Sequence, residues 1–181
     1  MVRGTPFWLI LFFVGLLAGS LYSISLKNEI ELFFMINQMT MTPIAYKGNQ
    51  WTILKESMGI HMIQLVGMWI GGLSKVTFVI SVILFIVIAF SYGFVITSFY
   101  LLYGFKGFVI NVLFFGLQGL IVVFVAMYIG EHSLRYQQRG KGVYFKTYIS
   151  VLGYTLLSVL MVSFIDAYIQ PVLQNMIHRI G

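Results

Sequence analysis

Two long apolar segments, 76–103 and 108–130, constrain the fold of this chain more than any other feature. Neither contains an acidic or basic residue. Each exceeds the roughly 20 apolar residues that a helix needs to cross a hydrocarbon layer ~30 Å thick. Only Gly104-Phe105-Lys106-Gly107 separates them. A link this short joins two helices as an antiparallel hairpin, and its glycines permit the turn. The sequence therefore predicts an all-α membrane protein, a polytopic helix bundle built around this hairpin.

The composition indicates that lipid, rather than a protein interior, covers most of the chain. Of the 181 residues, 60% are hydrophobic and 9% are charged, whereas about a quarter of the residues are charged in a soluble domain. The formal net charge of +6 comes from residues between the apolar segments. Anionic lipid headgroups, and not nucleic acid, are therefore the expected partner of these charges. The chain has no cysteine, which excludes disulfides and thiol chemistry.

We expect a single membrane domain over residues 1–181 with about five spans. The predicted spans are 7–24, 58–73, 76–103, 108–130 and 147–169. In the first, Gly15 and Gly19 are one turn apart and predict a small-residue face for close helix contact. A signal peptide is the alternative interpretation of this segment, but the apolar run is long and the rest of the chain is already polytopic. The polar region 25–57 predicts an external amphipathic helix on the membrane surface, followed by a loop.

Small and polar residues in the hairpin predict how its helices pack. Counted outward from the turn, Gly93 lies at about the depth of Gly116 and Gly119, so the two backbones should approach closely there. Gln118 then lies near mid-membrane, where an unpaired amide is costly. We therefore expect it to bond to another helix, and the candidate partners are Ser91, Thr97, His61 and Gln64.

His61 and Gln64 are polar residues one turn apart in the short second span. Polar residues within a membrane segment suggest a functional site. We favour the simpler interpretation that they face other helices or the headgroups, and two ligands at this spacing do not make a metal site alone. Asp166 lies near the end of the last span, where we expect headgroup-level solvation rather than a proton relay.

Two regions outside the spans are candidate partner surfaces. The external region 25–57 offers Glu29, Glu31 and Trp51, and Trp51 is also a plausible interfacial anchor. The loop expected over 131–146 is the most basic one, and it offers Arg135, Arg139 and Lys141. It carries four basic residues against one in the hairpin turn. The positive-inside rule therefore places this loop and the N-terminus in the cytoplasm.

No arrangement of side chains typical of catalysis is visible in the sequence. There is no H-E-x-x-H, and no Ser/His/Asp arrangement can be recognised. Gly140-Lys141-Gly142 lacks the spacing of a phosphate-binding loop. Glu131 and His132 are explained by a helix end at the headgroups. We expect a protein that is not an enzyme and that has no metal or cofactor.

Three local motifs resemble the stage II sporulation protein M family of integral membrane proteins. They are Tyr92-Gly93-Phe94, Gly104-Phe105-Lys106-Gly107-Phe108 and Phe115-Gly116-Leu117-Gln118. The order of the segments is similar too: a first span, an external region, a short second span, a long hairpin and a final helix. The family often has a proline before the polar residue of the third motif, where this chain has Leu117.

The resemblance implies two alternative functions. Sporulation members of the family act with the stage II sporulation proteins D and P, which cut peptidoglycan during engulfment. This chain would then be a scaffold for cell-wall hydrolases in the bacterial cytoplasmic membrane. Shorter, divergent relatives accompany ABC-type ATPases in circular-bacteriocin maturation, export or immunity. The basic region 131–146 would then contact a cytoplasmic ATPase. The short N-terminus and Leu117 favour the divergent branch, and the general usage of the family favours the scaffold.

Overall fold

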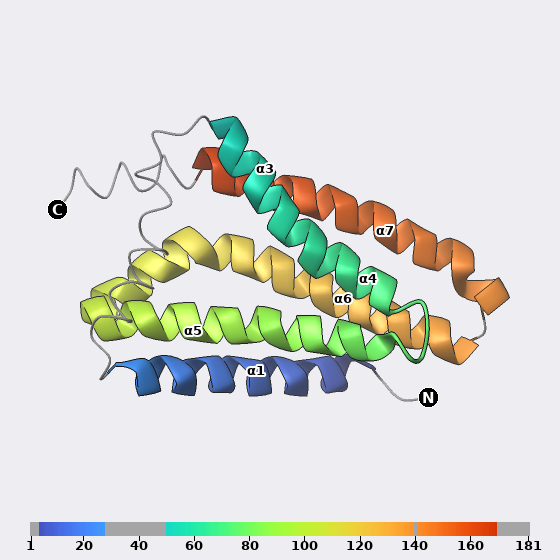
Figure 1. The fold of residues 1–181 in the computed structure, drawn as a ribbon, viewed down its shortest axis with the longest axis horizontal. Coiled ribbons are helices and arrows are strands. Elements are labelled where there is room, and N and C mark those ends of the chain that lie inside the picture. Colours follow the sequence, from blue (N-terminus) through green and yellow to red (C-terminus); the bar gives the residue numbers. More distant parts are fainter. Residues whose placement is uncertain (1–3, 28–49, 140, 170–181) are drawn as a thin grey trace.

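The computed structural model describes residues 4–27, 50–139 and 141–169, and its elements are all helices (Figure 1). In chain order they are α1 (Gly4–Leu26), α3 (Gln50–His61), η1 (Met62–Val66), α4 (Gly67–Gly71), α5 (Phe78–Asn111), η2 (Val112–Gly116), α6 (Leu117–Arg139), α7 (Lys141–Phe164) and η3 (Ile165–Ile169). The three η elements are short π-helices. The predicted all-α class is therefore confirmed.

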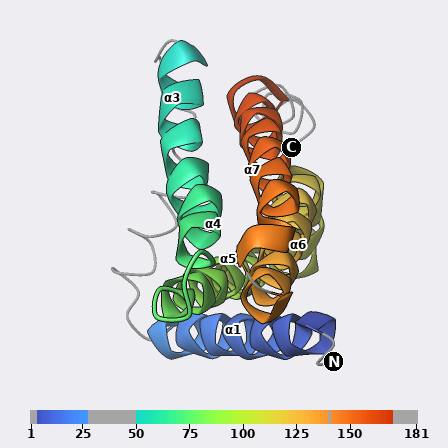
Figure 2. The same ribbon diagram turned by 90° about the vertical axis from the view of Figure 1, so that its right-hand side faces the viewer.

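Four helices in the described ranges are long and apolar enough to cross a membrane. They are Gly4–Leu26, Phe78–Val109, Leu117–Gln138 and Tyr144–Ile169. They match four of the five predicted spans and confirm the helical membrane bundle. In Figure 2, α3 and α7 stand side by side above the layer that contains α1 and α5.

The expected second span, 58–73, has different bounds in the structure. α3, η1 and α4 follow one another as a helical segment of 22 residues, roughly 33 Å long. The segment starts at the end of the bundle where α1 ends and finishes at the end where α5 begins (Figure 1). It is not among the four apolar helices, and its first half carries Lys55 and Glu56. The polar region was expected to extend to residue 57, but α3 already begins at Gln50. Its proposed amphipathic helix, with Glu29 and Glu31, lies outside the described residues.

The turn of the hairpin depends on its two glycines, as predicted. Gly104 interrupts α5 with φ 61° and ψ −146°, a conformation that is almost exclusive to glycine. The chain then folds back so closely that a Cβ at Gly107 would lie 2.0 Å from the carbonyl oxygen of Phe99. A larger residue at Gly104 would be strained by the backbone conformation there, and a larger residue at Gly107 would collide with the backbone of Phe99.

The predicted pairing of Gly93 with Gly116 is wrong, because Gly93 faces α1. A Cβ at Gly93 would lie 2.1 Å from the carbonyl oxygen of Leu16, whereas a Cβ at Gly116 would meet only Val112 within 4 Å. Instead, Gly119 is the glycine of α6 that faces α5, and its Cβ would lie 2.7 Å from the ring of Tyr92. Counting depth along two helices cannot tell which side of a helix a third helix will cover.

The small-residue face predicted for the first span packs directly on α5. A Cβ at Gly15 would lie 2.7 Å from the Cβ of Ala89, and a Cβ at Gly19 would lie 2.0 Å from the carbonyl oxygen of Phe90. One turn further, the hydroxyls of Ser23 and Ser98 are 2.9 Å apart. Close backbone approach of this kind is how small residues associate helices in lipid.

Cysteine pairs test this arrangement, since the chain has no cysteine of its own. We expect Gly15→Cys with Ala89→Cys to form a disulfide in native membranes, because the two Cβ atoms need to separate by only about 1 Å to reach disulfide geometry. We expect Gly93→Cys with Gly116→Cys to remain reduced under the same oxidant. Crosslinking of the second pair and not the first would contradict the observed packing of α1.

The described core lies between the helices, and aromatic side chains pack together at one end of it. Its largest buried side chains include Trp8, Phe85 and Tyr148. Tyr148 stacks on Trp69 of α4, and each of the two residues hydrogen-bonds to the backbone carbonyl of the other. These contacts fix α4 to α7 at the end where α6 and α7 meet.

Since α6 ends at Arg139 and α7 begins at Lys141, the loop predicted over 131–146 is wrong: both helices continue through most of it.

Candidate functional site

A group of polar side chains from three elements meets inside the bundle. His61 Nε2 of α3 lies 3.2 Å from Asp166 Oδ2 of η3. Ser57, one turn before His61 on the same face of α3, donates its hydroxyl hydrogen to the same carboxylate oxygen. Gln118 of α6 places its Nε2 3.4 Å from His61 Nε2. We call Ser57, His61, Gln118 and Asp166 the polar cluster.

The position of Asp166 corrects the sequence interpretation. We expected solvation at headgroup level, but the Asp166 side chain is only 12% exposed and that of His61 is 8% exposed. The last helical turn of the chain's final span is covered by α3, whose start the sequence did not predict. A buried carboxylate requires hydrogen-bond partners, and α3 places Ser57 and His61 within hydrogen-bond distance of Asp166.

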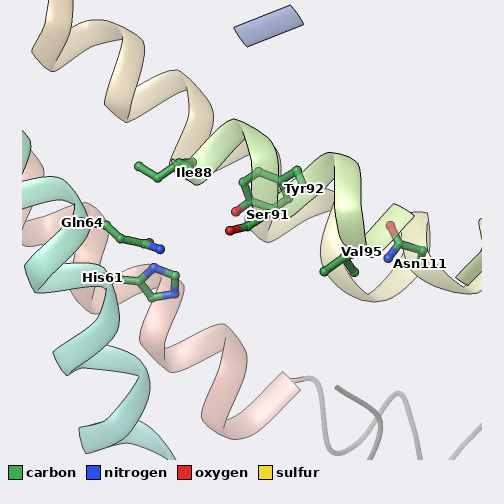
Figure 3. Close-up of a pocket in the computed structure, with 7 residues that line it drawn as sticks. All are labelled: His61, Gln64, Ile88, Ser91, Tyr92, Val95 and Asn111. Atoms are coloured by element: carbon green, nitrogen blue, oxygen red, sulfur yellow. The ribbon is translucent and has the colours of Figure 1, made fainter. Parts of the chain in front are cut away.

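The bond predicted for Gln118 is confirmed, with His61 as its partner among the four candidates. Gln64 does not join this contact, but it points from η1 into a neighbouring cavity, as Figure 3 shows. Of the other two candidates, Ser91 bonds to the carbonyl of Val87 in its own helix. Both polar residues of the second span therefore face other helices, which is the simpler interpretation favoured from the sequence.

The three π-helices in the described part of the chain all border this region. η1 begins directly after His61, η2 begins directly after Asn111 and ends just before Gln118, and η3 contains Asp166. A π-helical turn rotates the following side chains relative to an α-helix, and such turns are frequent at functional sites. Three of them around one cluster indicate that the backbone is adapted to bring these polar groups together.

A cavity of about 130 Å³ lies beside the polar cluster (Figure 3). It is lined by His61, Gln64, Ile88, Ser91, Tyr92, Val95 and Asn111. These side chains come from α3 and η1, from the part of α5 before Gly104 and from the part of α5 after Gly104. We call it the polar cavity, because most of its lining side chains carry a polar group.

Two of the lining residues have a polar atom without a hydrogen-bond partner in the described ranges. These atoms are Nδ1 of His61 and Nδ2 of Asn111. Asn111 is only 3% exposed, and His61 is 6% exposed. In the cluster itself, Oδ1 of Asp166 is in the same condition. Buried polar atoms in folded proteins are almost always satisfied, so these atoms mark a place where a further polar group fits.

The polar cluster pairs a histidine with a carboxylate inside the bundle. A histidine beside a carboxylate is half of a nucleophilic arrangement. Ser57 is bonded to the carboxylate and not to the imidazole. His, Asp and Glu gather nowhere in the described ranges in the group of three that would hold a metal ion.

Sequence reasoning missed Ser57, Asn111, Tyr92 and the burial of Asp166. The available signal was that Asp166 is the sole aspartate and stands in an otherwise apolar segment, which by itself suggests a functional residue. Asn111 gave a similar signal inside the second hairpin segment. Their convergence with His61 depends on the fold and is not visible in the spacing.

The candidate partner residues within the described ranges lie at the two ends of the bundle. Trp51 is exposed near the start of α3, and Lys55 lies over its ring at 5.3 Å. Arg135 is exposed near the end of α6 and pairs with Glu131, while Arg139 and Lys141 are the last residue of α6 and the first of α7. His132 accepts or donates a 2.8 Å bond with the hydroxyl of Tyr144. The structure brings none of these residues to the polar cluster.

Comparisons with known proteins give no match: neither a family model, nor a curated protein, nor a solved structure is significantly similar to this chain.

Proposed function

We propose that this chain is a non-enzymatic membrane scaffold, similar to stage II sporulation protein M, that supports a peptidoglycan-remodelling complex during sporulation engulfment. The observation that carries the proposal is the internal use of the buried ionisable groups. Asp166 and His61 bind each other and neighbouring helices, so they hold α3, α6 and η3 together. This arrangement is suited to a rigid platform for cell-wall hydrolases rather than to turnover of a substrate.

A second function is favoured by the shape of the basic end of the bundle. Because α6 continues to Arg139 and α7 starts at Lys141, the basic residues lie on a helical hairpin instead of a loose loop. Such a hairpin offers a preorganised surface to a cytoplasmic partner. This supports the alternative that the chain is the membrane subunit of an ABC-type ATPase system for circular-bacteriocin maturation, export or immunity.

The proposed location is the bacterial cytoplasmic membrane, with the N-terminus in the cytoplasm. If the segment formed by α3, η1 and α4 crosses the membrane with the four apolar helices, the chain makes five passes. The first residue of α1 and the junction of α6 with α7 then lie at the same end, as in Figure 1. That agrees with the positive-inside rule for Arg135, Lys141 and Lys146.

Co-purification with matched charge reversals tests both functions. The full chain is isolated from native membranes in wild-type form and as Arg135→Glu with Lys146→Glu, both of which are exposed. Lys106→Glu is the control, since Lys106 is exposed at the opposite end of the bundle. We expect the wild type to retain a cell-wall hydrolase and the double variant to retain it unchanged, because the hydrolase binds outside the cell.

The other outcomes are equally informative. An attached ATPase that is lost at least about tenfold from the double variant, and not from Lys106→Glu, would replace the scaffold proposal by the transport alternative. Absence of both partners from wild-type membranes would contradict both functions. Hydrolysis of peptidoglycan or of a precursor peptide by the purified chain alone would overturn the non-enzymatic assignment.

A further inference from the structure

We propose that the bundle binds a lipid with an uncharged headgroup that carries several hydroxyl groups, such as a glycolipid. The headgroup occupies the polar cavity, and the chain occupies a second, apolar cavity next to it. This binding is separate from the scaffold proposal, because it involves no partner protein.

The apolar cavity lies between α1, α5 and α6 and has a volume of about 430 Å³, which is within the usual range for small-molecule sites. Aliphatic and aromatic side chains dominate its lining, including Leu9, Phe12, Leu16, Ile96, Leu120 and Val123. Gly116 and Gly119 also line it, and the missing side chain of Gly116 leaves room beside η2. A cavity of this composition takes a hydrocarbon chain.

The two cavities are neighbours, because Tyr92 and Asn111 line both of them. On one side of this pair the lining is almost wholly apolar, and on the other it includes the polar side chains of His61, Gln64 and Ser91. A ligand that fills both cavities must therefore be amphipathic, with its polar and apolar parts meeting at Tyr92 and Asn111.

The polar groups are spread along the polar cavity, with His61 and Gln64 on one side and Asn111 at the far end in Figure 3. Asn111 Nδ2 can only donate a hydrogen bond. His61 Nε2 lies within hydrogen-bond distance of both Asp166 Oδ2 and Gln118 Nε2, and its Nδ1 donates or accepts according to the tautomer. Hydroxyl groups both donate and accept, and a headgroup with several of them can satisfy both ends.

Charged headgroups fit this cavity poorly. Its lining contains no lysine, arginine, aspartate or glutamate, and a charge taken from water without a partner is strongly disfavoured. A negative headgroup would also approach the carboxylate of Asp166, which is bonded to His61. A ligand without any polar end would leave Asn111 and His61 unsatisfied.

Photolabelling of the full chain in phosphatidylcholine nanodiscs tests the site. The probe is decyl glucoside with a diazirine in its alkyl chain, and the labelled residues are mapped by mass spectrometry. We expect labelling of residues of the apolar cavity on α1 and α6. Unlabelled decyl glucoside should compete at a concentration at least about tenfold lower than decane or decyl phosphocholine.

Two variants separate the two halves of the site. Gly116→Phe fills the apolar cavity, and its Cβ would meet only Val112 at ordinary contact distance, so labelling there should fall at least about tenfold. Gly153→Phe is the matched control, because nothing lies within 4 Å of a Cβ at that position on α7. Asn111→Leu keeps the branched shape and the number of heavy atoms of the side chain but removes the donor, and should weaken competition by decyl glucoside without changing that by decane.

Equal competition by decane and decyl glucoside would overturn the assignment of the polar cavity. Unchanged labelling of Gly116→Phe, or labelling spread over all lipid-facing residues, would overturn the site as a whole. If Gly116→Phe failed to fold, which its thermal unfolding would show, the Asn111→Leu comparison would still decide the proposal.

Discussion

His61→Leu is expected to destabilise the folded bundle by about 3–5 kcal/mol, because it removes one of the two polar partners of the buried Asp166 carboxylate. Breaking one side of a buried pair is costly, since the remaining group is held away from water. The measurement is the free energy of unfolding of the purified chain, obtained by titrating mixed micelles with SDS.

A double-mutant cycle shows whether this cost belongs to the pair. His61→Leu combined with Asp166→Leu removes both polar groups, so the double variant should lose clearly less than the sum of the two single losses. Arg135→Leu is the control, because its pair with Glu131 is largely exposed and should contribute less than about 1 kcal/mol. Strictly additive losses at His61 and Asp166 would show that the two side chains do not interact in the membrane.

Gly93→Ala is expected to destabilise the protein by about 1–3 kcal/mol through overpacking, and Gly93→Leu should detach α1 from the bundle. The added methyl group would lie 2.1 Å from the carbonyl oxygen of Leu16 and 2.9 Å from its Cα. Both are main-chain atoms, so no rotation of a side chain can relieve the clash. The same unfolding titration measures the loss, and failure of the disulfide between positions 15 and 89 reports the detachment.

The matched control is Gly153→Ala in α7, where a Cβ meets nothing within 4 Å. Alanine favours a helix over glycine by roughly 0.5–1 kcal/mol, so this variant should be slightly more stable than the wild type. If Gly93→Ala behaved like Gly153→Ala, the close approach of α1 and α5 would be absent in the membrane.

Much of the fold could be predicted because lipid imposes simple rules on a sequence. A backbone in hydrocarbon must satisfy its own hydrogen bonds, so long uncharged segments become helices, and four of the predicted spans are found. The sequence also predicted the turn at Gly104 and Gly107 and the small-residue face at Gly15 and Gly19. Each depends on glycine's missing side chain within a short stretch. That Gln118 bonds to another helix followed from the cost of an unpaired amide, and the structure identified His61 among the four candidate partners.

The candidate site was less predictable because it joins residues far apart in the chain. Asp166 and His61 are 105 positions apart, and they meet only because α3 begins at Gln50 and covers the end of α7. The predicted contact of Gly93 with α6 was wrong for a related reason. The face of α5 that carries Gly93 packs against α1, and counting depth along the hairpin could not show this. The π-helices beside the site could not be predicted, because the spacing of apolar residues does not distinguish a short π-helix from an α-helix.

Residue types and their spacing were enough to predict that lipid surrounds the chain, that it is helical and that it reverses at Gly104. Each of these is decided by the local balance of apolar surface, backbone hydrogen bonds and glycine geometry. Tertiary packing alone determines which helix faces meet. It placed α1 on α5, continued α6 and α7 through the expected basic loop, and enclosed Asp166 with Ser57 and His61. The physical reason is that nearly every side of these helices is apolar, so their hydrophobic pattern does not choose a neighbour, and the choice falls to close backbone contact and to a few buried polar groups.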